Sequence, residues 1–60
     1  MSQREIIEFL KNNPEWFTVK RLAMCLGYTV NRTKTNLSRM MWISEIVFKF
    51  ENNKYIYKHR

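Results

Sequence analysis

The sequence predicts a small α+β fold: three helices, a short extended segment ahead of the second helix, and a C-terminal β-hairpin. Apolar side chains recur at helical spacing up to residue 41, and after Trp42 the spacing changes to strict alternation. The chain has one glycine, Gly27, at a position where a helix would end. Its 60 residues form a single domain, 1–60, with a thin core, because a chain of this size buries only about 60% of its unfolded surface.

The first helix is predicted to start at a capping box made by Ser2 and Glu5. Ile6 and Leu10 follow at helical spacing and give the helix an apolar side. It should end at 12–14, because a proline disfavours helical backbone in the residue before it.

Residues 16–17 are apolar but too few for a helix, so we expect a short extended segment that enters the core. Thr18 is a suitable N-cap for a second helix that runs to Leu26 and ends at Gly27. Leu22 and its neighbours at helical spacing should face inward.

A third helix is predicted over about 30–41, with Thr29 as its N-cap. Its inward side is formed by Thr33, Leu37, Met40 and Met41. We expect Tyr28 and Trp42, which flank this helix, to pack against the core, and the four methionines to fill it.

Residues 46–51 alternate as a half-buried strand does, Asn52 and Asn53 suit a type I′ turn, and 54–58 form the return strand. A two-residue turn creates the cross-strand pairs Glu51–Lys54, Phe50–Tyr55 and Phe48–Tyr57. We expect the paired aromatic rings to form the core face of the sheet rather than a stacking platform for single-stranded nucleic acid.

The net charge of +6 favours a polyanionic partner. Between Phe17 and Ser44 there are five basic residues and no acidic one. The single cysteine, Cys25, cannot form an internal disulfide, which favours a reducing, cytoplasmic setting, and its position on the second helix suggests a small core filler.

The segment from Phe17 to Thr29 contains a leucine-alanine pair, then Leu26 and Gly27, with further core positions at Leu37 and Met40. This pattern, followed by a hairpin, resembles a winged helix-turn-helix DNA-binding domain over nearly the whole chain. It does not single out one regulator family. The chain departs from the usual pattern at Thr33, where valine or isoleucine is common.

The resemblance implies that the third helix enters the major groove of DNA. Its outward residues, which would read bases, are Asn31, Arg32, Lys34, Thr35 and Ser38. Residues expected to contact phosphates are Thr18, Lys20, Arg21, Thr29 and Arg39, and the wing contributes Lys49, Asn52, Asn53 and Lys54.

The chemistry of these side chains suits the task independently of the resemblance. Arginine can grip guanine and asparagine can grip adenine through paired hydrogen bonds, and a phosphate arriving at the second helix would find Lys20 and Arg21 there. Lys34 and Arg39 are as well suited to contacting phosphates as to reading bases. The alternative is an ordinary solvated helix face.

The expected function is therefore sequence-specific binding of double-stranded DNA by a small transcriptional regulator, cytoplasmic or nucleoid-associated. The one histidine, His59, lies at the terminus, and no zinc-ligand spacing, nucleophile–histidine pair or phosphate-binding glycine loop occurs. We expect no enzyme activity, metal, cofactor or small-molecule substrate. The apolar runs are too short for a membrane span.

The competing expectation is a winged-helix protein-interaction module in a larger nucleic-acid-processing assembly, with Trp16, Val47 and Ile56 as an exposed apolar patch. RNA binding comes third and an anionic membrane surface last. A domain of this size contacts only a few base pairs, so useful specificity favours a homodimer or neighbouring bound copies.

Overall fold

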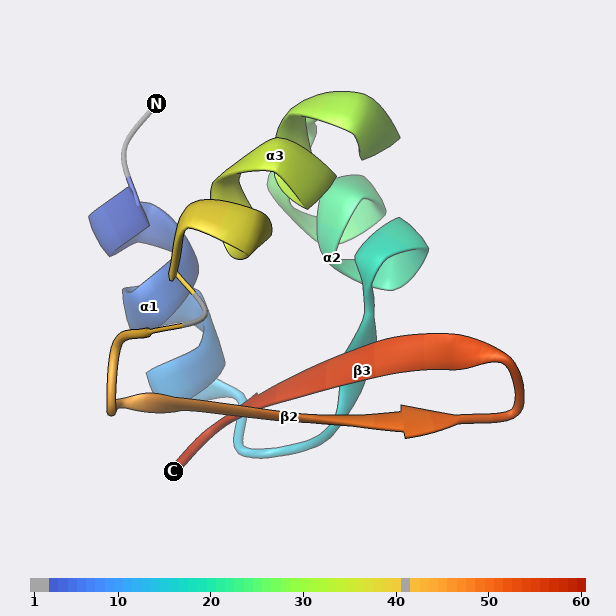
Figure 1. Cartoon of the computed structure of the whole chain (residues 1–60). Coiled ribbons are helices and arrows are strands. Elements are labelled where there is room, and N and C mark those ends of the chain that lie inside the picture. The colour runs from blue at the N-terminus through green and yellow to red at the C-terminus, as the bar shows by residue number, and fades with distance from the viewer. Residues whose placement is uncertain (1–2, 41) are drawn as a thin grey trace.

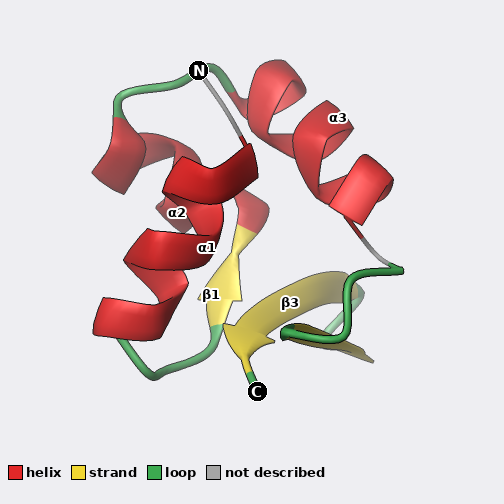
Figure 2. Cartoon of the chain, turned by 90° about the vertical axis from the view of Figure 1, so that its left-hand side faces the viewer, coloured by secondary structure: helices red, strands yellow, loops and turns green. Residues whose placement is uncertain are grey.

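The computed structural model describes residues 3–40 and 42–60 and has an α+β layout consistent with a winged helix (Figure 1). Within those residues the elements are α1 (Gln3–Asn12), β1 (Phe17–Thr18), α2 (Val19–Leu26), α3 (Val30–Met40), β2 (Ile46–Glu51) and β3 (Lys54–His59). The three helices lie on one side of a three-stranded antiparallel sheet of order β1-β3-β2 (Figures 1 and 2). The predicted fold class and order of elements are confirmed.

Helix α1 places Ile6 and Leu10 in the core, where both side chains are fully buried. At its C-terminal end the side-chain amide of Asn13 donates to the carbonyl oxygen of Phe9 at 2.8 Å. This bond satisfies one carbonyl that the end of the helix leaves without a partner. The predicted capping box begins at Ser2, which lies outside the described residues.

The extended segment ahead of α2 is strand β1, which joins the two hairpin strands in the sheet. In the β1–β3 pairing, Phe17 lies opposite Tyr57 and Thr18 lies opposite Ile56. The sequence predicted the segment but not its partner, because strand pairing over such a distance leaves no local pattern. The pairing directs Phe17 into the core, where only 2% of it is exposed.

Helices α2 and α3 form a helix-turn-helix whose caps are those predicted. The Thr18 hydroxyl oxygen accepts a hydrogen bond from the backbone N–H of Arg21 at 3.1 Å, and Gly27 ends α2 with a left-handed φ of 73°. The Thr29 hydroxyl oxygen accepts from the backbone N–H of Arg32 at 3.1 Å.

The inward side of α2 is narrower than expected. Leu22 and Ala23 are buried, but Cys25 is exposed and Met24 is 74% exposed. The expectation that Cys25 and all the methionines fill the core is therefore wrong. Neither side chain lies on the side of α2 that carries Leu22 and Ala23, because successive residues point in different directions around the helix axis.

Helix α3 buries Thr33, Leu37 and Met40, while Met41 lies outside the described residues. The Thr33 hydroxyl donates to the Thr29 carbonyl oxygen at 2.9 Å, so this buried polar group is satisfied. Trp42 is 81% exposed, and the expectation that it packs against the core is wrong. The helix ends at Met40, so Trp42 does not continue its buried side.

The hairpin has the predicted register, with Glu51 opposite Lys54, Phe50 opposite Tyr55 and Phe48 opposite Tyr57. Asn52 and Asn53 have φ values of 53° and 64°, as a type I′ turn requires.

The aromatic side of the hairpin is not wholly core, contrary to expectation. Tyr57 is 6% exposed, but Phe48, Phe50 and Tyr55 are 40%, 61% and 48% exposed. The end of the hairpin extends beyond the helices, which is consistent with the exposure of these rings (Figure 1).

The core lies between the helices and the inner half of the sheet. Its buried apolar side chains are Ile6, Leu10, Phe17, Leu22, Leu37, Met40, Ile46 and Tyr57. This arrangement leaves the outer face of α3 in solvent.

Candidate nucleic-acid interface

The outer face of α3 carries Asn31, Thr35 and Ser38, all of which are exposed. They point outward because the buried residues Thr33 and Leu37 occupy the opposite side of the helix. The five residues predicted to read bases are thus all exposed, and they occupy the centre and the two flanks of one helix face.

One flank of α3 forms an open hollow of about 620 Å³. Its lining residues are Thr29, Asn31, Arg32, Thr35, Asn36 and Arg39. Arg32 and Arg39 are the cations here, and Asn36 donates to the carbonyl oxygen of Arg32 at 2.8 Å.

Arg32 has an aromatic neighbour in the helix-turn-helix loop. Its guanidinium carbon lies 5.3 Å from the centroid of the Tyr28 ring, within cation–π range. The Tyr28 hydroxyl donates to a carboxylate oxygen of Glu5 on α1. That hydrogen bond, followed by desolvation and the negative charge of Glu5, raises the pKa of Tyr28 above 10.0. Tyr28 therefore ties α1 to the loop.

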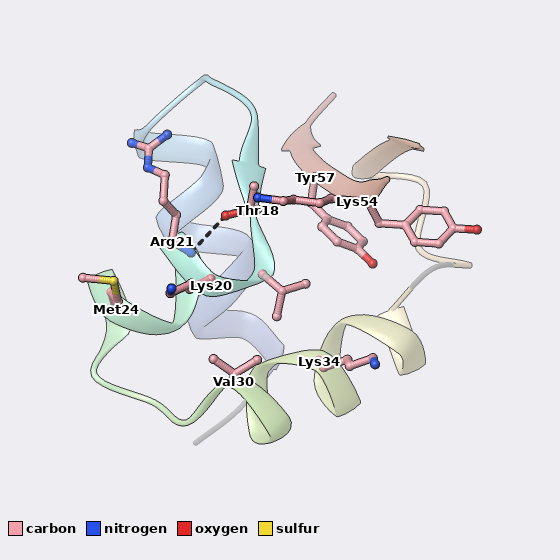
Figure 3. Close-up of a pocket in the computed structure, with 10 residues that line it drawn as sticks. Thr18, Lys20, Arg21, Met24, Val30, Lys34, Lys54 and Tyr57 are labelled. Atoms are coloured by element: carbon pink, nitrogen blue, oxygen red, sulfur yellow. Dashed lines mark hydrogen bonds between the residues drawn. The ribbon is translucent and has the colours of Figure 1, made fainter. Parts of the chain in front are cut away.

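The other flank of α3 borders a second hollow, also of about 620 Å³, enclosed by α2, α3 and β3 (Figure 3). It is lined by Thr18, Val19, Lys20, Arg21, Met24, Val30, Lys34, Lys54, Tyr55 and Tyr57. Elements distant in sequence thus place lysines and tyrosines around the apolar side chains of this hollow. The sequence predicts three different roles for Lys20, Lys34 and Lys54, namely phosphate contact, base reading and wing contact. In the structure all three line this hollow.

Three lysines at this hollow differ from Arg21 in their partners. Within the described residues, Lys20, Lys34 and Lys54 have no ion pair. Arg21 donates to Glu15 at 3.3 Å, and its guanidinium carbon lies 4.5 Å from the centroid of the Phe17 ring.

Arg21 is accordingly directed away from the hollow in Figure 3. A phosphate at this hollow would meet the lysines before this arginine.

The two threonines predicted to contact phosphates serve as helix caps. Thr18 and Thr29 each accept a backbone N–H with the side-chain oxygen. A hydroxyl that accepts in this way retains its own hydrogen for donation, so capping leaves each side chain one hydrogen bond for a phosphate.

The wing residues have different surroundings. Lys54 lines the hollow, whereas Lys49 contacts Glu51 at 3.6 Å and stands 4.5 Å from the centroid of the Trp16 ring. Asn52 and Asn53 are exposed at the tip. Glu51 lies opposite Lys54 in the hairpin register, yet among the described residues its carboxylate forms an ion pair with Lys49 and not with Lys54.

The apolar patch predicted to bind a protein partner is only partly exposed to solvent. Trp16, Val47 and Ile56 are half-buried, and Trp16 is contacted by the ammonium groups of Lys49 and Lys58 at 4.5 and 5.4 Å from its centroid. The exposed apolar side chains instead include a cluster on the outer hairpin, formed by Phe48, Phe50 and Tyr55. In the sequence, this cluster is indicated by the length of the two hairpin strands, because the short helices have too few residues to cover them.

Comparison with family models, with curated proteins and with solved structures gives no match for this chain. Among the described residues, no helix is long and apolar enough to cross a membrane. The same residues contain no group of three or more histidine, cysteine, aspartate or glutamate side chains arranged to hold a metal ion.

Proposed function

We propose that this protein binds double-stranded DNA, with α3 in the major groove and the hairpin beside it, as a small sequence-specific regulator. The observation that carries the proposal is the distribution of charge around α3. Arg32 and Arg39 lie on one flank, Lys34 lies on the other, and no carboxylate among the described residues lines either hollow.

Four of the five acidic side chains, all except Glu8, contact partners outside α3. Glu5 accepts the Tyr28 hydroxyl, Glu15 pairs with Arg21, and Glu51 pairs with Lys49. Glu45 lies 4.0 Å from His59 at the far end of the sheet. Within the described residues the cations of α3 therefore form no ion pair and are available to an external polyanion, as expected of an electrostatic footprint for nucleic acid.

Cations on both flanks of α3 support insertion of this helix into a major groove. A groove about 12 Å wide admits one helix and is bordered by a phosphate backbone on each side. With α3 inserted, the arginine flank would contact one backbone, and Lys20, Lys34 and Lys54 would contact the other. Contacts on both sides would set the position of the helix, while its outer face reads bases.

Base discrimination is assigned to the N-terminal half of α3. Asn31 and Arg32 can each form paired hydrogen bonds, with adenine and guanine respectively. Thr35 and Ser38 would add single hydrogen bonds or a methyl contact to thymine. This function uses no cofactor, metal or small-molecule substrate and is not catalytic, and it places the protein in the cytoplasm or on the nucleoid.

The salt dependence of binding tests the proposal. If the five side chains Lys20, Arg32, Lys34, Arg39 and Lys54 each neutralise one phosphate, log affinity should fall against log salt with a slope of about −4 to −5. Fluorescence anisotropy with a labelled duplex measures it. Absence of binding at low salt would refute DNA recognition, and preferential capture of duplex RNA in direct competition would redirect the proposal to RNA.

The second candidate is a protein-interaction module of a nucleic-acid-processing assembly. The observation in its favour is the exposure of Phe48, Phe50 and Tyr55. Weak DNA affinity with no salt dependence would favour this candidate. A homodimer on DNA remains part of the leading proposal, and titration of a two-site duplex would detect it as cooperative binding.

A further inference from the structure

We propose that the exposed aromatic side of the hairpin is a stacking site for an unpaired DNA nucleotide, where the duplex held by α3 opens or ends. This inference rests on the proposed function, because α3 must hold the duplex for its end to reach the hairpin. It adds a preference for junctions between double- and single-stranded DNA.

The first support is a contiguous set of exposed rings. The Phe50 and Tyr55 centroids lie 5.0 Å apart, and those of Phe48 and Tyr55 lie 6.0 Å apart. All three side chains are at least 40% exposed. Clustered exposed aromatics indicate a binding surface in a soluble domain, unlike apolar residues scattered singly.

The second support is the charge beside the rings. Tyr55 also lines the hollow that contains Lys20, Lys34 and Lys54. A nucleotide stacked on the rings would therefore carry its phosphate close to these ammonium groups. Aromatic rings beside a positively charged groove are the combination by which proteins bind single strands without sequence preference.

The third support is the position of the hollow relative to α3. Val30 and Lys34 of α3 form one wall, while Lys54 and Tyr55 of β3 form another. A strand leaving the groove beside α3 would thus meet the rings directly. The volume of about 620 Å³ lies within the range of about 300–1,000 Å³ that small-ligand sites occupy.

Charge also distinguishes a nucleotide from a second copy of this chain. Two copies joined through their rings would bring the lysines of both hollows together, and like charges across an interface oppose association. A nucleotide offers an aromatic base for the rings and an anion for the lysines.

The test uses the intact protein and DNAs that share one duplex. The first DNA is blunt, the second carries a single-stranded thymidine overhang, and the third carries an overhang of abasic sites with equal charge and no bases. Fluorescence anisotropy should show the thymidine overhang bound about tenfold more tightly than the abasic one, the effect of stacking one or two bases. A fluorescent adenine analogue in the overhang should lose emission on binding.

Variants at Phe50 separate stacking from general apolar contact. Phe50→Tyr keeps a ring and should keep the preference, whereas Phe50→Leu keeps apolar surface and should lose most of it. Trp42→Ala removes another exposed aromatic ring and serves as the matched control, which should preserve the preference. Circular dichroism checks that each variant folds.

The outcomes separate this inference from the proposed function. Equal affinity for the thymidine and abasic overhangs, with tight binding of the blunt duplex, overturns the stacking site and leaves duplex recognition intact. Absence of binding to every DNA overturns both proposals. Concentration-dependent dimerisation of wild-type protein that Phe50→Leu abolishes would assign the rings to a second copy and overturn the stacking site.

Discussion

At the scale of the residue, cations that look alike in the sequence differ in what surrounds them. Lys20 and Arg21 are neighbours at the start of α2, yet Arg21 contacts Glu15 and the Phe17 ring, whereas Lys20 has no ion pair among the described residues. An exposed pair such as Arg21–Glu15 contributes little to stability, about 0–1 kcal/mol. It still fixes where the guanidinium points, and so distinguishes Arg21 from Lys20.

Arg32 should determine sequence preference. Arg32→Ala is expected to cost about 1–3 kcal/mol on the preferred duplex and much less on others, because a paired contact to guanine is lost. Lys20→Ala, the matched control, should weaken binding to all sequences alike. Anisotropy titrations on preferred and unrelated duplexes measure both. Equal losses for Arg32→Ala on every duplex would remove it from base readout.

Tyr28 should titrate above 10.0, because the hydrogen bond from its hydroxyl to Glu5 favours the neutral form and raises its pKa. Burial, with a smaller effect from Tyr55, raises the pKa of Tyr57 too. A tyrosine whose folded-state pKa exceeds its unfolded value stabilises the fold below the unfolded value. That contribution is lost as pH rises through the folded pKa. The free energy of unfolding should therefore fall at alkaline pH beyond about 10.

Glu5→Gln isolates the contribution of the carboxylate. Ultraviolet titration of tyrosinate absorbance should show one tyrosine moving to a lower pKa in this variant, with Tyr57 unchanged. A titration curve identical to that of the wild type would show that Glu5 does not hold the Tyr28 hydroxyl in solution.

At the scale of the element, the helix-turn-helix depends on its caps. Thr18 and Thr29 begin α2 and α3, and Gly27 ends α2 with φ of 73°. Each is a local interaction spanning three or four residues, which is why sequence patterns predict them. They set the bend that leaves the outer face of α3 free.

Gly27→Ala should lower the free energy of unfolding by about 1–2 kcal/mol, because a Cβ disfavours left-handed backbone. A Cβ at Gly27 would meet no atom within 4 Å, so the expected cost is conformational only. Urea denaturation measures it, with Met24→Ala as an exposed control in α2. Gly27→Asn should cost less, since asparagine tolerates this conformation. Equal stability of wild type and Gly27→Ala would contradict the cap.

At the scale of the whole molecule, the helices cover only part of the sheet. The core side chains lie between the helices and the inner hairpin, and the outer hairpin projects beyond them with its rings exposed (Figure 1). A domain of this size has a total stability of about 3–9 kcal/mol. The fold therefore tolerates exposed aromatics on the hairpin but not a cavity in the core.

Leu37→Ala should remove much of that stability, because truncating a buried leucine costs about 2–5 kcal/mol. Leu37 is 1% exposed, whereas the next residue, Ser38, is exposed and provides the matched control Ser38→Ala. Thermal denaturation followed by circular dichroism should show a large fall in melting temperature for the first variant and little change for the second. Similar melting temperatures for both would refute the assignment of Leu37 to the core.

The sequence by itself determined the helices, the caps of α2 and α3, the turn at Asn52 and Asn53, and the hairpin register. These depend on hydrogen bonds and backbone preferences within a few residues, or on the alternation of a single strand pair. The sequence pattern also indicated which side chains of α3 face outward. The residues of α3 predicted to read bases rest on that pattern.

Only the tertiary structure decided what covers each apolar side chain and which cations lie together. Cys25, Trp42 and the rings of Phe48, Phe50 and Tyr55 are exposed, which their local spacing does not reveal. Likewise, β1 pairs with β3, and Lys20 and Lys54 share a hollow, through contacts between segments far apart in the chain. Burial and charge clustering depend on the relative placement of whole elements, which local sequence patterns do not specify.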